Sequence, residues 1–143
     1  MHDTIERSIA ISAPLERVWD LVTEPGWWVP ADEPVTADRT PGVVVNRESE
    51  KYGRFPVQVV DLKPMTYAAF RWSSTYPNAD LEPGRTTLIE FTLSPSDDGV
   101  TVSVVESGFA ALDATDEQKR QGIEGNTDGW RMELDSLRTR AEN

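Results

Sequence analysis

Apolar and polar residues alternate in six stretches of the chain, with the period of β-strands that bury one face. The first stretch, 4–11, places Ile5, Ile9 and Ile11 on the same side, together with Arg7. Five more stretches follow at 42–49, 54–62, 66–74, 86–93 and 100–109, with turn-forming residues between them. The pattern therefore predicts a sheet of several antiparallel strands.

Between the first two stretches, residues 14–23 change to the period of a helix. Their apolar positions fall at i, i+3, i+4 and i+7: Leu15, Val18, Trp19 and Val22. Pro14 suits the first position of a helix, and the Pro25-Gly26 pair ends it. We expect a short amphipathic helix that rests on the sheet.

Residues 24–41 are rich in proline and acidic side chains, which predicts a loop or a broken helical turn, followed by a short strand at 34–38. Trp27 and Trp28 are adjacent in this segment. Neighbouring side chains in a regular backbone point in different directions. We therefore expect one of the two rings beneath the loop and the other at an opening.

The last thirty residues predict a long helix, from about Thr115 to Ala141. Its apolar positions repeat at i, i+4, i+7, i+11 and i+14: Ile123, Thr127, Trp130, Leu134 and Leu137. Thr115 and Gln118 have the spacing of a capping box, which marks the start of a helix.

Three glycines, Gly122, Gly125 and Gly129, form a second stripe beside this apolar face. Each glycine inside a helix costs about 1 kcal/mol relative to alanine. Two explanations are open. The helix begins only near Thr127 and the glycines belong to a loop or kink, or the glycines leave empty space under the helix.

A strand, a short helix, several antiparallel strands and a long terminal helix make an α+β arrangement. We see no internal repeat and expect residues 1–143 to form a single domain. If the curved sheet wraps around the long C-terminal helix, the result is a helix-grip fold. Trp72, Phe91 and Trp130 then line its inner face.

The amino-acid composition excludes several kinds of catalytic and metal site. The chain has no cysteine, and its one histidine, His2, lies next to the N-terminus, so thiol catalysis, a Ser-His pair and a zinc site lack their side chains. We expect no metal and no cofactor. The net charge of −11 repels nucleic acid and anionic membranes. Because no apolar run approaches 18 residues, we expect a cytoplasmic protein without membrane insertion.

Three segments carry a resemblance to a known family. The segment "IAISAPLERVWDLVTEPGWW" resembles the opening of the START-like, or Bet v 1-like (SRPBCC), superfamily. The segments "TTLIEFTLSPSDDGVTVSVVESGF" and "GNTDGWRMELDSLRTRAE" resemble the branch related to the C-terminal domain of the activator of Hsp90 ATPase. The resemblance implies a helix-grip fold with an internal cavity. This branch of the superfamily is similar to many stand-alone bacterial proteins. The co-chaperone's first domain has no counterpart in this chain.

Glu106 ends the stretch at 100–109 and shares its side with Val100, Val102 and Val104. An unbroken strand aims this carboxylate inward, where it needs a partner such as Arg7 or Arg71. A bulge near Val104 would reverse the assignment. The alternative is an exposed strand end with a solvated carboxylate.

Aromatic side chains supply most of the other candidates for the inner face. Each aromatic ring buries about 150–250 Å², so such rings can be present simply to form the hydrophobic core. A ligand site has the same kind of apolar lining with only a few polar groups beside the rings. The candidate cavity residues are Arg7, Trp19, Trp28, Phe55, Phe70, Trp72, Phe91, Glu106, Phe109, Asn126 and Trp130.

Three functions compete. The first is a binding module that holds a small, largely apolar molecule between sheet and terminal helix, with Arg7, Glu106 or Asn126 fixing its orientation. The second is an enzyme of the cyclase or hydratase kind found on this fold, in which Glu106, Tyr52 or Tyr67 moves a proton. The third is a chaperone-interaction domain that uses an exposed face. The sequence favours the binding module.

Overall fold

The structure of the chain is a computed structural model that describes residues 3–33, 38–76 and 78–143. His2 and most of the short strand expected at 34–38 therefore lie outside the described residues. Six strands form one sheet in the order β1-β6-β5-β4-β3-β2, and every neighbouring pair is antiparallel. Their bounds are β1 Thr4–Ile11, β2 Val44–Ser49, β3 Gly53–Lys63, β4 Tyr67–Trp72, β5 Thr87–Ser96 and β6 Gly99–Ser107.

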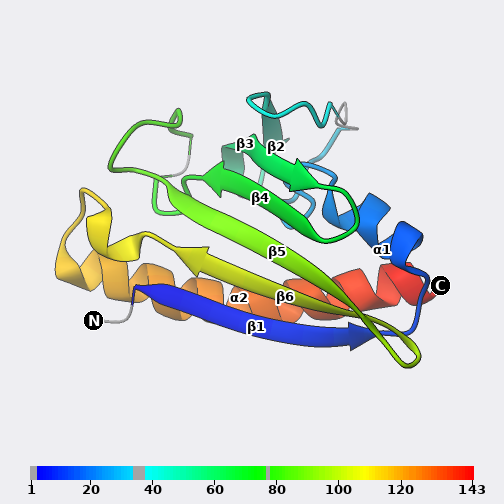
Figure 1. The fold of residues 1–143 in the computed structure, drawn as a ribbon. Helices are drawn as coiled ribbons and strands as arrows, with labels where there is room; N and C mark the ends of the chain where they lie inside the picture. The colour runs from blue at the N-terminus through cyan, green and yellow to red at the C-terminus, as the bar shows by residue number, and fades with distance from the viewer. Residues whose placement is uncertain (1–2, 34–37, 77) are drawn as a thin grey trace.

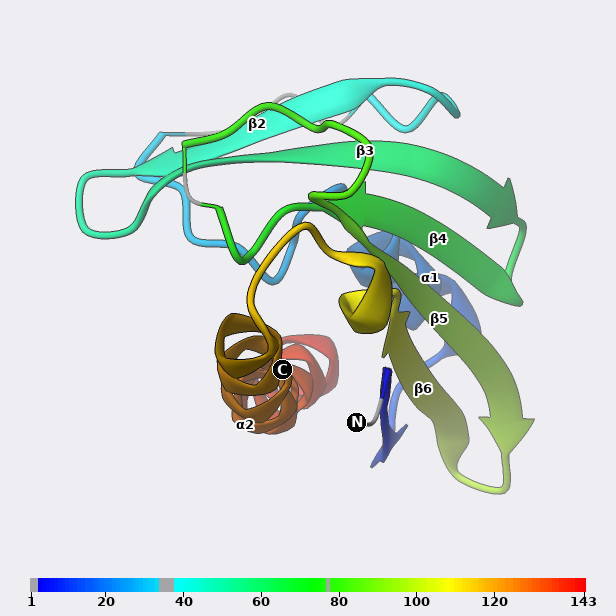
Figure 2. The same ribbon diagram turned by 90° about the vertical axis from the view of Figure 1, so that its left-hand side faces the viewer.

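The helices complete an α+β fold of the helix-grip type, as the sequence predicts. A short helix, α1 (Leu15–Val22), follows β1, and a long helix, α2 (Asp116–Glu142), ends the chain after a 3₁₀ turn, η1 (Phe109–Ala111). The sheet curves from β2 to β1 around α2, which is seen along its axis in Figure 2 and along its length in Figure 1. No helix of the described residues is long and apolar enough to cross a membrane.

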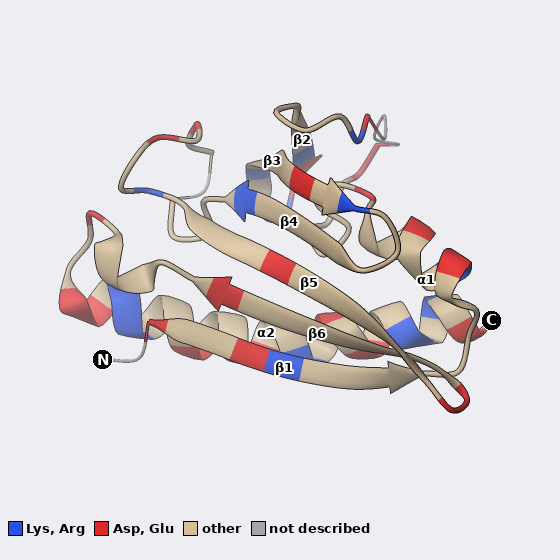
Figure 3. Ribbon diagram, in the orientation of Figure 1, with Lys and Arg blue, Asp and Glu red and all other residues tan. Residues whose placement is uncertain are grey.

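β6 is a regular strand in the middle of this arrangement. Its register with β1 and β5 has no interruption, and Val100, Val102, Val104 and Glu106 are all buried on one side. The bulge considered near Val104 is absent, and the irregularity lies in β3, between Val59 and Asp61. Glu106 therefore points into the core. Figure 3 shows acidic and basic residues distributed over the strands, the helices and the loops between them.

α2 runs without a break through all three glycines, so the proposed start near Thr127 is wrong. Thr115 and Gln118 form the expected capping box in both directions. Arg17 on α1 closes the other end by donating to the carbonyl oxygens of Ala141, Arg140 and Asn143 at 2.7–2.9 Å. These contacts satisfy backbone groups that a helix cannot pair by itself.

Trp27 and Trp28 are both buried, each with 6% of its surface exposed. Trp28 also lines a surface groove, as expected for one of the two rings, but it packs inside as well. The segment that carries them is a series of turns, with hydrogen bonds from Trp27 N to Glu24 O and from Val29 N to Gly26 O. Gly26 has a φ of +74°, and a Cβ there would lie 2.7 Å from Cγ of Arg47. Since this backbone is not regular, adjacent side chains can enter the same core.

Candidate functional site

A groove opens at one end of the grip, between the β2–β3 hairpin, the end of β4, the loop after Trp27 and one stripe of α2. Its volume is about 360 Å³. Tyr52 and Met132 on its lining are exposed by 52% and 57%, so the groove is open to solvent there. We call it the aromatic groove. Its lining residues are Trp28, Val29, Pro30, Tyr52, Phe55, Trp72, Ser74, Asn126, Gly129, Trp130, Met132 and Glu133.

Helix α2 contributes a stripe at i, i+3, i+4 and i+7 to this groove: Asn126, Gly129, Trp130 and Glu133. A Cβ at Gly129 would meet nothing within 4 Å, so the missing side chain leaves room in the groove. Gly125 also has open space, but it is exposed and does not line the groove. Gly122 lies against Thr75 and Phe109. The empty space expected under the helix is therefore at Gly129.

The rings around the groove pack against one another at several angles. Trp28 lies 5.7 Å from Trp72, edge to face, and 5.6 Å from Trp130 at a tilt of 48°. Phe55 lies 6.0 Å from Trp72 at a tilt of 46°. Pairs at these separations are favourable beyond their buried area. The groove therefore has walls that support each other without any ligand.

Glu106 lies directly behind two of these walls, fully buried. Trp130 Nε1 donates to Glu106 Oε1 and Trp72 Nε1 to Glu106 Oε2, both at 2.8 Å. Thr87 Oγ1 donates to Oε2 at 2.6 Å, and Asn126 Nδ2 lies 3.1 Å and 3.3 Å from the two oxygens. An ionised carboxylate only accepts hydrogen bonds, and these donors fill its sites. One carboxylate on β6 thus joins β4, β5 and α2.

This environment differs from both sequence expectations for Glu106. The carboxylate is not solvated, and neither Arg7 nor Arg71 is its partner, because both arginines are exposed. No ion pair reaches it from the described residues. Neutral donors can replace a cation here because hydrogen bonds to a charged acceptor are about twice as strong as neutral ones. Thr87 was missed, since only the register that sets it opposite Trp72 brings it near.

The structure divides the expected cavity residues into groups. Trp28, Phe55, Trp72, Asn126 and Trp130 line the groove, and Glu106 lies behind it. Three phenylalanines are fully buried in the core away from the groove: Phe70, Phe91 and Phe109. Trp19 is partly buried on α1, and Arg7 is exposed on β1. Neither lies at the groove.

The two tyrosines considered for proton transfer also separate. Tyr52 is at the rim of the groove. Tyr67 alternates with the inward residues of β4 and donates to Glu90 Oε2 at 2.5 Å, away from the groove. Partial burial, together with this carboxylate, raises the pKa of Tyr67 to about 12.

Glu133 is a groove residue that the sequence interpretation missed. Its position three residues after Trp130 and seven after Asn126 was the available signal. The side chain is partly buried, and desolvation raises the pKa of its carboxyl, while Arg140 acts in the opposite direction. Among the described residues it has no hydrogen-bond or ion-pair partner.

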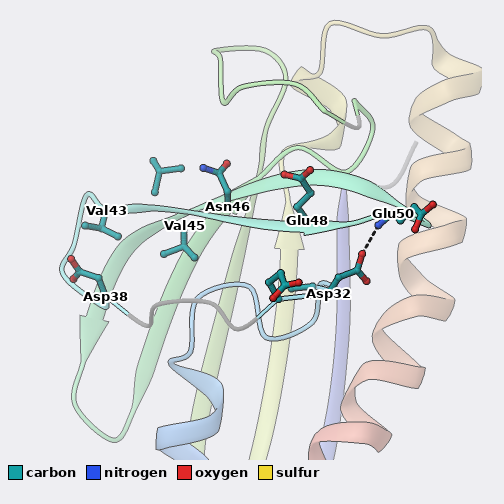
Figure 4. Close-up of a pocket in the computed structure, with 10 residues that line it drawn as sticks. Asp32, Asp38, Val43, Val45, Asn46, Glu48 and Glu50 are labelled. Carbon is teal, nitrogen blue, oxygen red and sulfur yellow. Dashed lines mark hydrogen bonds between the residues drawn. The ribbon is translucent and has the colours of Figure 1, made fainter.

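A larger hollow, of about 920 Å³, runs along the edge strand β2 and is lined by Asp32, Asp38, Glu48 and Glu50 among others. Figure 4 shows its carboxylates spread along the strand, with Asp38 at one end and Glu50 at the other. Asp32 accepts from the backbone N–H of Glu50 at 2.7 Å, and Asp38 accepts from Thr40 at 3.0 Å. In the described ranges no three acidic or histidine side chains are grouped to hold a metal ion. Asp32 and Asp38 therefore stabilise the local backbone through these hydrogen bonds.

Comparison with family models assigns the chain to a family. Residues 12–142 match the model described as "Activator of Hsp90 ATPase homolog 1-like protein". The chain belongs to this family. A search of curated proteins found no match.

Several solved structures share the fold. Protein CV1439 from Chromobacterium violaceum is 23% identical, with a TM-score of 0.71 over 100% of this chain and 99% of that one. MLL2253 from Mesorhizobium loti is 20% identical, with a TM-score of 0.72 over 95% and 94%. The Aha1 dimer from Colwellia psychrerythraea is 19% identical, with a TM-score of 0.73 over 99% and 97%.

Replacing Glu106 by glutamine tests the carboxylate behind the groove. Each Glu106 oxygen accepts an indole N–H, so neither orientation of the glutamine amide avoids setting NH₂ against a donor. We expect Glu106→Gln to lower the free energy of unfolding by about 2–4 kcal/mol in urea denaturation. The indole N–H groups of Trp72 and Trp130 should then exchange faster with solvent.

The matched control is Glu90→Gln, because the Glu90 carboxylate accepts only the Tyr67 hydroxyl among its side-chain contacts and a glutamine oxygen can still do so. We expect a loss within about 1 kcal/mol. Equal losses in the two variants would show that the Glu106 network has no special weight.

Glu133→Gln tests the raised pKa of the Glu133 carboxyl by its effect on stability. A carboxyl with a raised pKa in the folded state binds a proton more readily there, so the charged form lowers stability at higher pH. We expect the variant to be more stable than the wild type at pH 7. The difference should close as the pH falls through the folded-state pKa to the ordinary value of 4.5. Thermal unfolding of both proteins across this range measures it, and a constant difference would contradict the assignment.

Proposed function

We propose that the protein binds a small, largely apolar molecule in the aromatic groove. The observation that carries this proposal is the open space at Gly129, in a hollow whose walls include Trp28, Phe55, Trp72 and Trp130. A volume of about 360 Å³ is near the lower end of the range for small-molecule sites. The ligand is therefore small, comparable to two or three fused or linked rings.

The proposed location differs from the closed cavity implied by the family resemblance. The interior of the grip is filled by a core that includes Trp27, Phe70 and Phe91. The free space is the aromatic groove, which is lined by residues of α2 and of the β2–β3 hairpin. A ligand there keeps one side toward solvent, which favours reversible binding over permanent enclosure.

A second candidate is the insertion of an apolar side chain from a partner protein into the same groove. Tyr52 and Met132 favour it, because large apolar side chains exposed together often mark an interaction surface. The family's similarity to an activator of Hsp90 ATPase is consistent with a protein partner. Direct binding of small molecules to the purified protein separates this candidate from the first.

Replacing Gly129 by leucine should block the groove. We expect the neutral dye N-phenyl-1-naphthylamine to bind the wild type at one equivalent, with energy transfer from tryptophan, and Gly129→Leu to weaken binding by at least about tenfold through steric overlap. The dye's fluorescence during titration measures this. The variant should remain folded, since leucine is favoured over glycine in a helix by about 1 kcal/mol.

Gly125→Leu is the matched control, because it makes the same change one turn away on the exposed side of α2. It should gain similar helix stability and bind the dye like the wild type. If the wild type binds no dye, the small-molecule proposal fails and the protein-partner candidate gains support. Equal effects of the two variants would place the dye elsewhere.

A further inference from the structure

The lining of the aromatic groove carries charge of one sign, although Lys51 lies at the rim beside Tyr52 and Arg140 acts on Glu133 from outside the lining. Among its lining residues only Glu133 is charged, and none is a lysine or arginine. The buried carboxylate of Glu106 lies behind the Trp72 and Trp130 walls. A ligand with a negative group therefore meets two carboxylates and no cation on the lining.

The groove lining leaves polar groups of both kinds free. The Tyr52 hydroxyl can donate or accept, the Trp28 indole N–H is a buried donor without a partner in the part of the chain that the structure describes, and two acceptors remain on α2. The Glu106 carboxylate fixes the orientation of the Asn126 amide, because the NH₂ group must face it. Asn126 Oδ1 then has no hydrogen-bond partner among the described residues, and neither does the Glu133 carboxylate. Two turns of helix, about 10 Å, separate these positions along α2. On the α2 side the free groups are therefore acceptors, and they match a ligand that brings donors.

The walls of the groove suit a cation as well as an apolar body. Aromatic faces attract ammonium groups, and several rings around one hollow are a recurrent way to bind them. At the rim, Lys51 Nζ lies 5.1 Å from the centre of the ring of its neighbour Tyr52. An aromatic amine combines a flat apolar part with such a group.

We propose that the aromatic groove selects small aromatic amines in their protonated form, with the ring system over Gly129 and the ammonium group beside Glu133. This inference rests on the proposed function and names the chemical class of its ligand. The ammonium group replaces the ion-pair partner that Glu133 lacks. Carboxylates of similar size bind more weakly, because the Glu133 charge repels them.

Three naphthalene ligands that differ only in one substituent test this selection. They are 1-naphthylmethylamine, which is a cation at pH 7, neutral 1-naphthalenemethanol and the anion 1-naphthoate. We expect the amine to bind the wild type about tenfold more tightly than the alcohol, and the acid to bind more weakly than both. Quenching of tryptophan fluorescence gives the three dissociation constants, and Gly129→Leu should weaken all three.

Glu133→Gln should weaken binding of the amine by about three- to tenfold. It should change the dissociation constant of the alcohol by no more than about twofold. Glu124→Gln is the control, since it makes the same charge change at an exposed position of α2 outside the groove. It should leave the amine's affinity unchanged, which separates local pairing from attraction by the overall charge of −11.

The possible failures are distinct. If none of the three ligands binds, the proposed small-molecule function fails. If the alcohol binds and the amine gains nothing, or if Glu133→Gln and Glu124→Gln reduce amine binding equally, the groove binds apolar molecules but does not select amines. The present inference is then overturned while the proposed function stands.

Discussion

The carboxylate of Glu106 is the constraint on which the site depends. Removing a charge from water costs several kcal/mol, and this carboxylate has no cation to offset that cost among the described residues. Four neutral donors from β4, β5 and α2 do so together. Each donor has to arrive at the right position, so the carboxylate defines how α2 lies against the sheet. It also sets the orientation of the two indoles whose rings form walls of the groove.

The groove exists because one stripe of α2 faces the core and a different stripe faces the groove. Leu134, Leu137 and Ala141 face the core and anchor the C-terminal half of the helix. Asn126, Gly129 and Glu133 face the groove and leave it open. Trp130 belongs to both stripes, and its hydrogen bond to Glu106 fixes the point where they meet. The same helix can therefore be firmly packed and still offer space for a ligand.

Hydrophobic periodicity was sufficient to predict the architecture. The six strands, both helices and the capping box at Thr115 follow from local patterns, which the structure confirms. Periodicity also placed Glu106 on the inner side of β6, but it gave no means of choosing between burial and a solvated strand end. Its partners come from three other elements, at separations that only the sheet register and the docking of α2 define.

The other differences from the sequence interpretation have similar causes. The inward position of both Trp27 and Trp28 depends on turns in the backbone, for which a strand or helix period is not informative. Arg7 shares the inner parity of β1 with the buried Ile5 and Ile11 but is itself exposed, which periodicity alone does not distinguish. Gly125 and Gly129 are indistinguishable in the sequence, and only the direction that each faces separates the exposed glycine from the one in the groove.

The most direct measurement of the central claim is an NMR titration of the protein with 1-naphthalenemethanol, in which contacts between ligand and protein protons are observed. The account predicts nuclear Overhauser contacts from the naphthalene ring to the α-protons of Gly129 and to the rings of Trp28 and Trp72, with the indole N–H signal of Trp19 unchanged. Contacts to α1 near Trp19, or a bound ligand without any contact to Gly129, would contradict the account.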